Sequence, residues 1–168
     1  MADVKTAYGT YTALTVTNLQ SLANDGTDPY GGWQSDRVDN RSTLALDYEV
    51  VVDLSTANTA PANDQAAYVY LVPWVHNGSS WISGGNFGTT TLPTGTEGTA
   101  SISDPNSMRG PIVIPYKVAQ QRLQTYINVV EMCGECPDGW SLAIRNCTGA
   151  ALGTGCVVAY RPITKTVV

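Results

Sequence analysis

Charge is scarce in this sequence, and basic charge is scarcer than acidic charge. Only 14% of the 168 residues are charged, and nine lysines and arginines stand against fourteen aspartates and glutamates. An average globular protein has roughly 25% charged residues. The basic residues are scattered, so no basic patch is available to displace counterions from phosphates. We therefore expect no direct nucleic-acid partner and no binding to an anionic membrane surface.

Long apolar runs are also missing. No uninterrupted apolar stretch approaches the ~20 residues that a transmembrane helix requires. The first residues, MADVKTAYGTYTALTV, contain neither a basic n-region nor an apolar h-region, so no secretory signal is expected. With 43% hydrophobic residues, the chain is still apolar enough to pack a core. We expect one soluble domain, made in a cytoplasm, that folds without needing disulfides.

Alternation with a period of two residues is the strongest pattern that is present. In LALDYEVVVDL, one predicted strand face carries Leu44, Leu46, Tyr48, Val50, Val52 and Leu54. The opposite, solvent-exposed face carries Asp47, Glu49 and Asp53. The run AYVYLVPWVH is apolar on both faces and predicts a buried strand. Because Pro73 lacks an amide N–H, it is placed at an edge or a bulge.

The rest of the chain repeats this strand-and-turn pattern. Further strands are predicted over residues 11–19, 110–118, 124–132, 140–146 and 156–162, with a weaker one over 99–103. Helical spacing occurs only briefly, in KVAQQRL and NLQSLA, and residues 84–105 are expected to form a long surface loop. Roughly eight short strands with turns rich in Gly, Pro, Asn and Asp predict an all-β antiparallel jelly roll or β-sandwich. The predicted domain spans residues 14–168, after a possible N-terminal arm over residues 1–13 that has no core pattern of its own.

Four cysteines are the first candidates for special chemistry: Cys133, Cys136, Cys147 and Cys156. A zinc site made of two cysteine knuckles needs two closely spaced pairs, and only the first pair has that spacing. A thioredoxin-like site needs a helix after Cys-x-x-Cys, whereas Pro-Asp-Gly follows here. We interpret the cysteines as structural, either reduced or disulfide-bonded, with Cys147 and Cys156 at the mouth of a hairpin of residues 140–146 and 156–162. A structural zinc site is the alternative.

Other catalytic groups are few. His76 is the only histidine, and it ends a predicted strand beside an Asn-Gly turn. Neither G-x-S-x-G nor H-E-x-x-H is present. We therefore expect His76 to be a surface residue at a strand end.

Paired carboxylates for glycoside hydrolysis would have to come from Asp36, Asp39, Asp47, Glu49 and Asp53. The alternation places three of them on a solvent-exposed strand face, and Asp39 is expected to accept turn hydrogen bonds or to pair with Arg37 or Arg41. We expect no enzyme, no cofactor, and no catalytic or cofactor-binding residue.

Large aromatic side chains are the remaining feature. Among the four tryptophans, Trp33 and Trp81 lie in predicted loops and are the candidates for stacking on sugar rings. The same amphipathic aromatics are used in β cores and in protein interfaces. The aromatics are therefore compatible with both a sugar-binding module and a protein-binding one.

Two blocks of the sequence resemble a family of small tailed-bacteriophage virion proteins. The first is WQSDRVDNRSTLALDYEVVVDL, whose matching residues are Ser35, Val38, Asp39, Asn40, Leu44, Leu46, Asp47 and Tyr48. The second is PDGWSLAIRNCTGAAL followed by a closing strand, with Pro137, Trp140, Asn146, Thr148, Gly149, Ala150, Ala151, Leu152, Val158 and Tyr160. The resemblance extends from about residue 24 to residue 162, and it is loose over residues 78–106. The four cysteines and the residues before Leu14 are not features of that family.

The resemblance implies a jelly-roll capsid cement or decoration protein on the virion. Such a protein is a homo-oligomer, dimer or trimer, that binds the major capsid protein lattice and stabilises the phage head. The alternative is a tail- or fibre-associated carbohydrate-binding jelly-roll module. Tryptophans exposed together would favour the sugar binder, whereas apolar surfaces and termini ordered by neighbours would favour cement.

Overall fold

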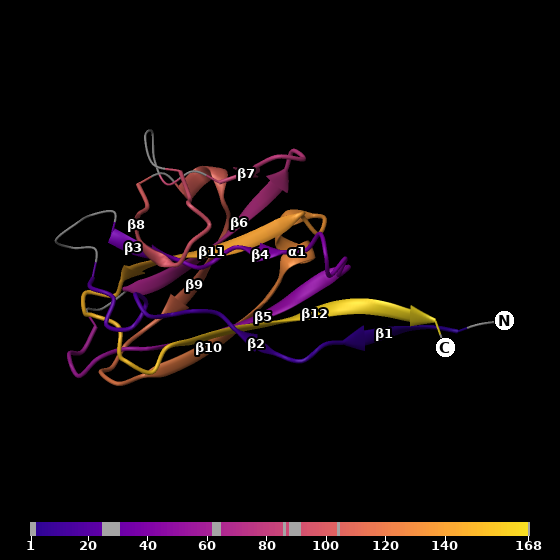
Figure 1. The fold of residues 1–168 in the computed structure, drawn as a ribbon. Coiled ribbons are helices and arrows are strands. Elements are labelled where there is room, and N and C mark those ends of the chain that lie inside the picture. The colour runs from indigo at the N-terminus through magenta and orange to yellow at the C-terminus, as the bar shows by residue number, and fades with distance from the viewer. Residues whose placement is uncertain are drawn as a thin grey trace.

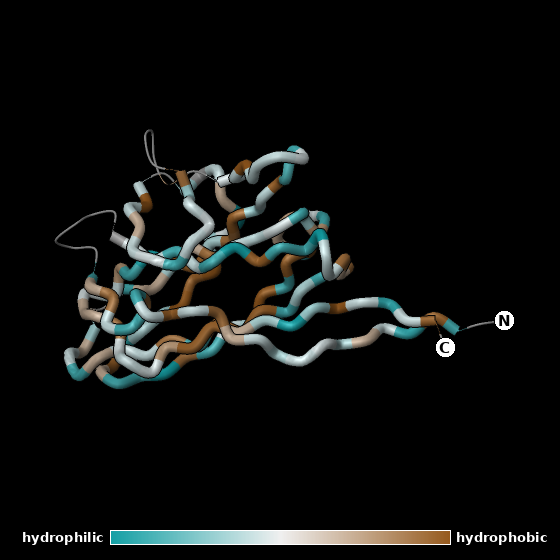
Figure 2. The backbone as a smooth tube through the Cα atoms, viewed as in Figure 1, coloured by the Kyte–Doolittle hydropathy of each residue, from teal (hydrophilic) through white to brown (hydrophobic). Residues whose placement is uncertain are grey.

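The computed structural model describes residues 3–24, 31–61, 65–85, 87, 92–103 and 105–167. Two curled antiparallel sheets face one another as a sandwich (Figure 1). The predicted all-β fold is therefore confirmed. Hydrophobic segments gather where the two sheets face each other (Figure 2), and the described chain contains no helix long and apolar enough to cross a membrane.

Each sheet is assembled from segments far apart in the sequence. Sheet A has the order β1 (Val4–Tyr8), β12 (Val157–Val167), β5 (Asp47–Ser55) and β10 (Arg122–Asn128), and the short β2 (Thr12–Ala13) also pairs with β12. Sheet B has the order β7 (Trp81–Ser83), β6 (Ala66–His76), β11 (Gly139–Cys147), β3 (Gly31–Gln34) and β8 (Gly98–Ser101). In sheet B, β4 (Val38–Asp39) also pairs with β11, and β9 (Arg109–Pro115) pairs with β6. The described helices are η1 (Pro105–Ser107) and α1 (Val129–Cys133).

Strand β5 follows its predicted alternation, but it begins later than expected. Its inward side chains, from Tyr48 to Leu54, are at most 1% exposed. Leu44 and Leu46 were predicted on the same buried face, and this is wrong: they precede the strand and are 74% and 51% exposed. A turn comes before them, and Leu44 adopts a positive φ of 49°, so the extended alternation starts only at Asp47.

Strand β6 is the strand that the apolar run predicted, and most of its side chains are buried on both faces. On one side it pairs with β11, where Pro73 lies opposite Trp140. On its other side, β9 pairs as far as Leu71 and β7 begins at Trp74. Pro73 therefore lies in the gap between two partner strands, where no amide N–H is required of it. The predicted edge or bulge position is wrong, because β6 pairs on both sides and its register irregularity lies between Val69 and Leu71.

Two hydrophobic cores lie on opposite sides of sheet B. The first fills the space between the sheets and includes the aromatic cluster of Tyr48, Trp140 and Tyr160. The second lies on the outer face of sheet B and joins Tyr70, Val72, Trp74 and Ala143 to Phe87, Ile102 and Met108. The segment predicted as a surface loop, residues 84–105, is thus a cover whose described apolar side chains include several that are buried. Residues 86, 88–91 and 104 of that segment lie outside the described part.

Several local predictions were wrong. Strands β11 and β12 were predicted to pair as a hairpin, but they belong to different sheets. The predicted strand over 11–19 is reduced to β2, and the two short helical patterns form turns and the start of β10. The one described α-helix, α1, occupies the end of the strand predicted over 124–132. There the Asp47 carboxylate accepts a hydrogen bond from the amide of Val130 at 2.9 Å, and Gly134 ends the helix with a left-handed φ of 83°.

The two chain termini form one two-stranded arm. Strand β1 pairs with the end of β12 in the register Val4↔Val167 to Tyr8↔Ile163. Since β5 begins at Asp47, opposite Ile163, the last residues of β12 pair only with β1 among the described strands. Figure 1 shows this arm projecting beyond the sandwich. The possible N-terminal arm over 1–13 therefore includes, in its described residues, strands that pair with the C-terminus.

Candidate interaction surface

The outer face of sheet A is an exposed surface built by regular strands. Residues paired across neighbouring strands share a face, so the register places on it the side chains of Tyr8, Tyr11, Glu49, Val51, Tyr126, Val157 and Arg161. We call these seven residues the tyrosine–arginine face. No described element packs over it as the segment after β7 packs over sheet B.

The apolar and aromatic members of this face are open to solvent. Tyr126 is 62% exposed, Tyr8 57%, Tyr11 45% and Val157 43%. Tyrosine and arginine are enriched among the residues that dominate binding energy in protein interfaces. The face therefore has the composition of a protein interface.

A bulge in the edge strand brings two tyrosines to one arginine. The register of pairing with β12 shifts by one residue between Gly9, which bonds Pro162, and Thr12, which lies opposite Tyr160. Because of this shift, Tyr8 and Tyr11 both lie on the outer face. The guanidinium of Arg161 lies 4.6 Å from the ring centre of Tyr8 and 4.9 Å from that of Tyr11. A side chain at position 9 would clash, because a Cβ there would lie 2.8 Å from the Pro162 ring.

Glu49 fixes this arginine from the neighbouring strand. Its carboxylate accepts hydrogen bonds from the Tyr11 hydroxyl and from Arg161 Nη2, the latter 2.9 Å from Oε1 and 3.1 Å from Oε2. These donors lower the pKa of Glu49, with the Tyr11 hydroxyl as the largest cause. The same bond raises the pKa of Tyr11, and the Glu49 carboxylate raises that of Arg161. Glu49 and Arg161 thus neutralise each other within the face. Tyr8 and Tyr11, although Arg161 lies over their rings, remain 57% and 45% exposed.

Asp53 was predicted to be exposed on this face, and this is wrong. The residue is 4% exposed, and its carboxylate accepts hydrogen bonds at 2.7 Å from Arg122 Nε and from Gln124 Nε2. Both partners lie on β10, directly beside it. A buried carboxylate held by two donors has a structural role. Among the carboxylates of β5, Asp47 and Glu49 remain partly exposed, and both are hydrogen-bonded.

The four cysteines do not form one site. None of them is joined in a disulfide, and the described residues contain no group of three or more potential metal ligands. Cys133 and Cys136 flank the C-terminal cap of α1 and pack against the core between the sheets, whereas Cys156 is buried near Ser55. Cys147 ends β11, so the predicted Cys147–Cys156 hairpin mouth is absent.

Burial makes three of these thiols poor nucleophiles. It raises the pKa of Cys133 and Cys156, and it raises the pKa of Cys136 to about 11. Thiolate, not thiol, attacks disulfides and binds metals. Little thiolate is therefore present at Cys136 near neutral pH. Its Sγ instead accepts a hydrogen bond from the Asn40 amide at 3.3 Å.

The other predicted polar residues serve the local structure. His76 ends β6 as predicted: its amide donates to Asp138, and its Nδ1 accepts from the amide of Gly78 at 3.1 Å. Asp39 pairs with Arg41 at 2.6 Å, and Asp36 accepts from the amide of Glu97. Each of these polar side chains therefore has a local partner in a turn or at a strand end.

The tryptophans do not form a sugar-binding platform. Trp33 was predicted in a loop, but it lies in β3, is fully buried, and donates its indole N–H to Glu97 at 2.7 Å. Trp81 is half-buried, with the guanidinium of Arg37 at 4.1 Å and that of Arg41 at 4.5 Å from its ring centre. The chain's own cations occupy the ring that a sugar would need.

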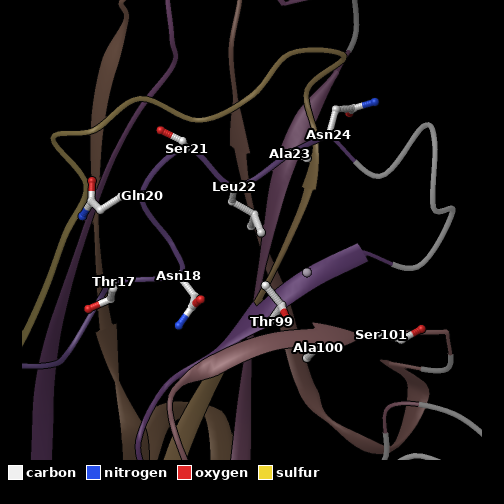
Figure 3. A pocket seen from close by; sticks show the side chains of 11 residues that line it. Thr17, Asn18, Gln20, Ser21, Leu22, Ala23, Asn24, Thr99, Ala100 and Ser101 are labelled. Atoms are coloured by element: carbon white, nitrogen blue, oxygen red, sulfur yellow. The ribbon is translucent and has the colours of Figure 1, made fainter.

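A separate hollow of about 480 Å³ lies between residues 17–24 and the paired strands β3 and β8 (Figure 3). Small and polar side chains line it, including Asn18, Gln20 and Ser101. Its lining residues include no carboxylate, histidine or cysteine. The hollow therefore offers hydrogen bonds and several hydroxyl groups, but its lining residues include no carboxylate or imidazole that could activate a hydroxyl as a nucleophile.

Comparison of the chain with protein families, with curated proteins and with solved structures gave no match. Function must therefore be inferred from the surface itself.

Proposed function

We propose that this chain is a non-enzymatic virion structural protein, a capsid cement or decoration protein that binds between major capsid protein subunits through its tyrosine–arginine face. The observation that carries the proposal is the contrast between the two outer faces. Sheet B is covered by a long segment of the chain's own, whereas sheet A presents exposed tyrosines and valines. Exposed apolar patches of this kind mark interaction sites.

The size of the face suits a protein partner. The three strands that lie side by side, β12, β5 and β10, at a spacing of about 4.8 Å and with roughly seven residues each at about 3.4 Å, span roughly 340 Å² in projection, to which β1 and β2 add at the edge. The accessible area of a corrugated surface is larger than its projection. It is of the same order as the ~800 Å² per partner that a specific interface buries.

Binding to an assembled shell explains why such a face stays open in the isolated chain. A ligand that binds only the assembled state stabilises that state by mass action. A lattice presents several coat subunits at one place, whereas a free coat subunit presents only part of the surface. Binding to a fragment buries too little area to offset the lost rotational and translational freedom.

The sequence resemblance supports the same proposal, although its residues serve the fold. Asn40 bonds the backbone of Ala45 and accepts from the Tyr48 hydroxyl at 2.8 Å. Asn146 and Thr148 bond each other and the carbonyl of Ala150. The shared blocks thus specify a scaffold, and the tyrosine–arginine face gives that scaffold its use in this chain.

The test uses particles that lack the protein and a matched pair of exposed valines. Val157 lies on the face and is 43% exposed, whereas Val113 lies on β9 of sheet B and is 51% exposed. We expect Val157→Lys to weaken saturable binding to particles at least tenfold and Val113→Lys to leave it within twofold. A similar loss in both variants, or in neither, contradicts the assignment of the face.

A glycan panel and free coat subunits complete the experiment. Tight binding to a glycan without binding to particles would support the alternative, a tail- or fibre-associated carbohydrate-binding module. Binding to free coat subunits as strong as binding to particles would contradict a cement role.

A further inference from the structure

Strand β1 is an open edge of sheet A. Its one described partner strand is β12, and the order of the sheet ends with β1. An edge strand presents a row of backbone donors and acceptors to any strand of matching geometry. The hydrogen bonds between β1 and β12 show which β1 residues direct these groups outward.

Two hydrogen bonds fix the direction of the backbone groups. The amide of Gly9 donates to the carbonyl of Pro162 at 2.9 Å, and the carbonyl of Lys5 accepts from the Thr166 hydroxyl. In an antiparallel pair, residues alternate between bonding the partner and pointing away from it. Positions 5, 7 and 9 therefore face β12. The N–H and C=O groups of Val4, Thr6 and Tyr8 point away from the sheet.

We propose that β1 pairs antiparallel with β1 of a second copy of this chain, across a two-fold axis at Thr6. The axis must stand perpendicular to the sheet, so residue numbers in each pair add up to an even number. Centring on Thr6 pairs Val4 with Tyr8, Thr6 with Thr6, and Tyr8 with Val4. All three outward-pointing residues then exchange hydrogen bonds with the other copy.

Side chains favour the same register. It places each Val4 opposite a tyrosine, which is a favourable aromatic–β-branched pair, and it forms a Thr–Thr pair. Lys5 lies opposite Ala7, so no like charges meet. Centring on Lys5 would set two lysines opposite each other, and centring on Ala7 would leave Val4 unpaired. Both of these alternatives bond only two of the three outward residues in each strand.

The pairing would join two copies of sheet A edge to edge, with both tyrosine–arginine faces on the same side. A strand as short as β1, with 5 residues, buries much less than the ~800 Å² per partner of a stable interface, so the dimer in solution is weak. Two faces held side by side would bind a common surface with increased avidity. The pairing itself does not depend on what that surface is.

The main test is a proline at the two-fold axis. Because the Thr6 N–H points outward, Thr6→Pro removes a donor that only the second copy uses, and edge strands tolerate proline at such positions. The control Thr6→Val keeps the donor and the β-branched shape. Sedimentation of the full chain up to ~1 mM covers Kd values in the range of a weak dimer.

We expect the natural chain and Thr6→Val to dimerise, and we expect Thr6→Pro to raise Kd roughly tenfold or more. Unchanged amide protection in β12 would show that the arm is intact in the proline variant. A natural chain that stays monomeric throughout this range, or a proline variant that dimerises as well as the natural chain, overturns the proposal.

A charge exchange tests the register. Ala7→Lys should weaken the dimer several-fold, because the lysine introduced in each copy would face Lys5 of the other copy. Adding Lys5→Glu should restore the dimer, because each introduced lysine then faces a glutamate. Failure of the double variant to recover, while the single variant is weakened, would rule out the Thr6-centred register.

The outcomes separate this inference from the proposed function. A chain that dimerises but does not bind particles refutes the cement role and leaves the pairing standing. A chain that binds particles as a monomer refutes the pairing and leaves the cement role standing.

Discussion

The outer faces of the two sheets differ in what covers them. On sheet B, Tyr70, Val72 and Trp74 lie under a cover that includes Phe87 and Ile102 and are at most 6% exposed. On sheet A, tyrosines and valines of the tyrosine–arginine face are open. The chain thus forms a second hydrophobic core on the outer face of sheet B and leaves the tyrosine–arginine face of sheet A exposed. The covered face serves stability, whereas the open face is free to serve binding.

The sharpest test of this comparison truncates one large aromatic residue on each face. Trp74→Ala should lower the free energy of unfolding by about 3–5 kcal/mol, because it removes a buried ring and leaves Ser141 without the indole N–H that donates to it at 2.9 Å. Tyr126→Ala should cost no more than ~0.5 kcal/mol, because its ring is already in water.

Denaturant titration of both variants measures the difference. Particle binding should show the reverse order, with Tyr126→Ala weakened by about 1–2 kcal/mol if Tyr126 is an anchor. Equal stability losses would mean that Tyr126 is covered in solution and that the contrast between the faces is wrong.

Two valines give a smaller but better-matched comparison. Val72 and Val51 both point outward from central strands, one under the cover and one on the open face. Val72→Ala should cost about 1–3 kcal/mol through lost burial and a residual cavity, and Val51→Ala should cost less than about 1 kcal/mol. Thermal or denaturant unfolding distinguishes them. A larger cost at Val51 would contradict the assigned register of β5.

Gly9 tests the geometry of the open face without removing any ring. In Gly9→Ala the new Cβ would lie 2.8 Å from Cγ of Pro162, so the bulge between β1 and β2 must shift. We expect faster amide exchange in the arm and a loss of about 1 kcal/mol or less, since the arm contributes little core. The protection of the β11 amides from hydrogen exchange should not change. Unaltered exchange throughout β1 would show that the bulge does not depend on glycine.

Lowering the pH is expected to have the smallest effect on the stability of the fold. Because the pKa of Glu49 is lower in the folded chain than its ordinary value of 4.5, its contribution to stability is complete above that value. This contribution is lost as pH falls through the lower, folded-state pKa. The natural chain should therefore lose thermal stability relative to Glu49→Gln between about pH 5 and pH 3. Parallel melting curves of the two proteins over this range would show that the bonds to Tyr11 and Arg161 do not hold Glu49 in solution.

The strand predictions were correct where the strand's own hydrophobic pattern decides which side chains are buried. Alternation located β5, and the double-sided apolar run located β6. Prediction failed where a distant segment decides the outcome. Asp53 has the spacing of an exposed residue, and only the Arg122 and Gln124 side chains of β10 make it buried.

The candidate surface was harder to predict than the fold. Tyr8, Tyr11, Tyr126 and Arg161 come from both ends and the later part of the chain, and none of them belongs to a sequence motif. Trp33 and Trp81 looked more promising as binding residues, but one is buried and the other is stacked against arginines. Exposure of an aromatic residue depends on its three-dimensional neighbours, which spacing does not reveal.

The sequence by itself determined the all-β class, the turn-rich connections and the inward face of the central strands, because these follow from local alternation and turn chemistry. The tertiary structure decided which sheet face is covered, the separation of β11 from β12 into different sheets, and the joining of the two termini in one arm. Each of these depends on pairing between distant segments or on the packing of one segment over another. Such contacts are selected by the free energy of the whole fold, to which no local pattern corresponds.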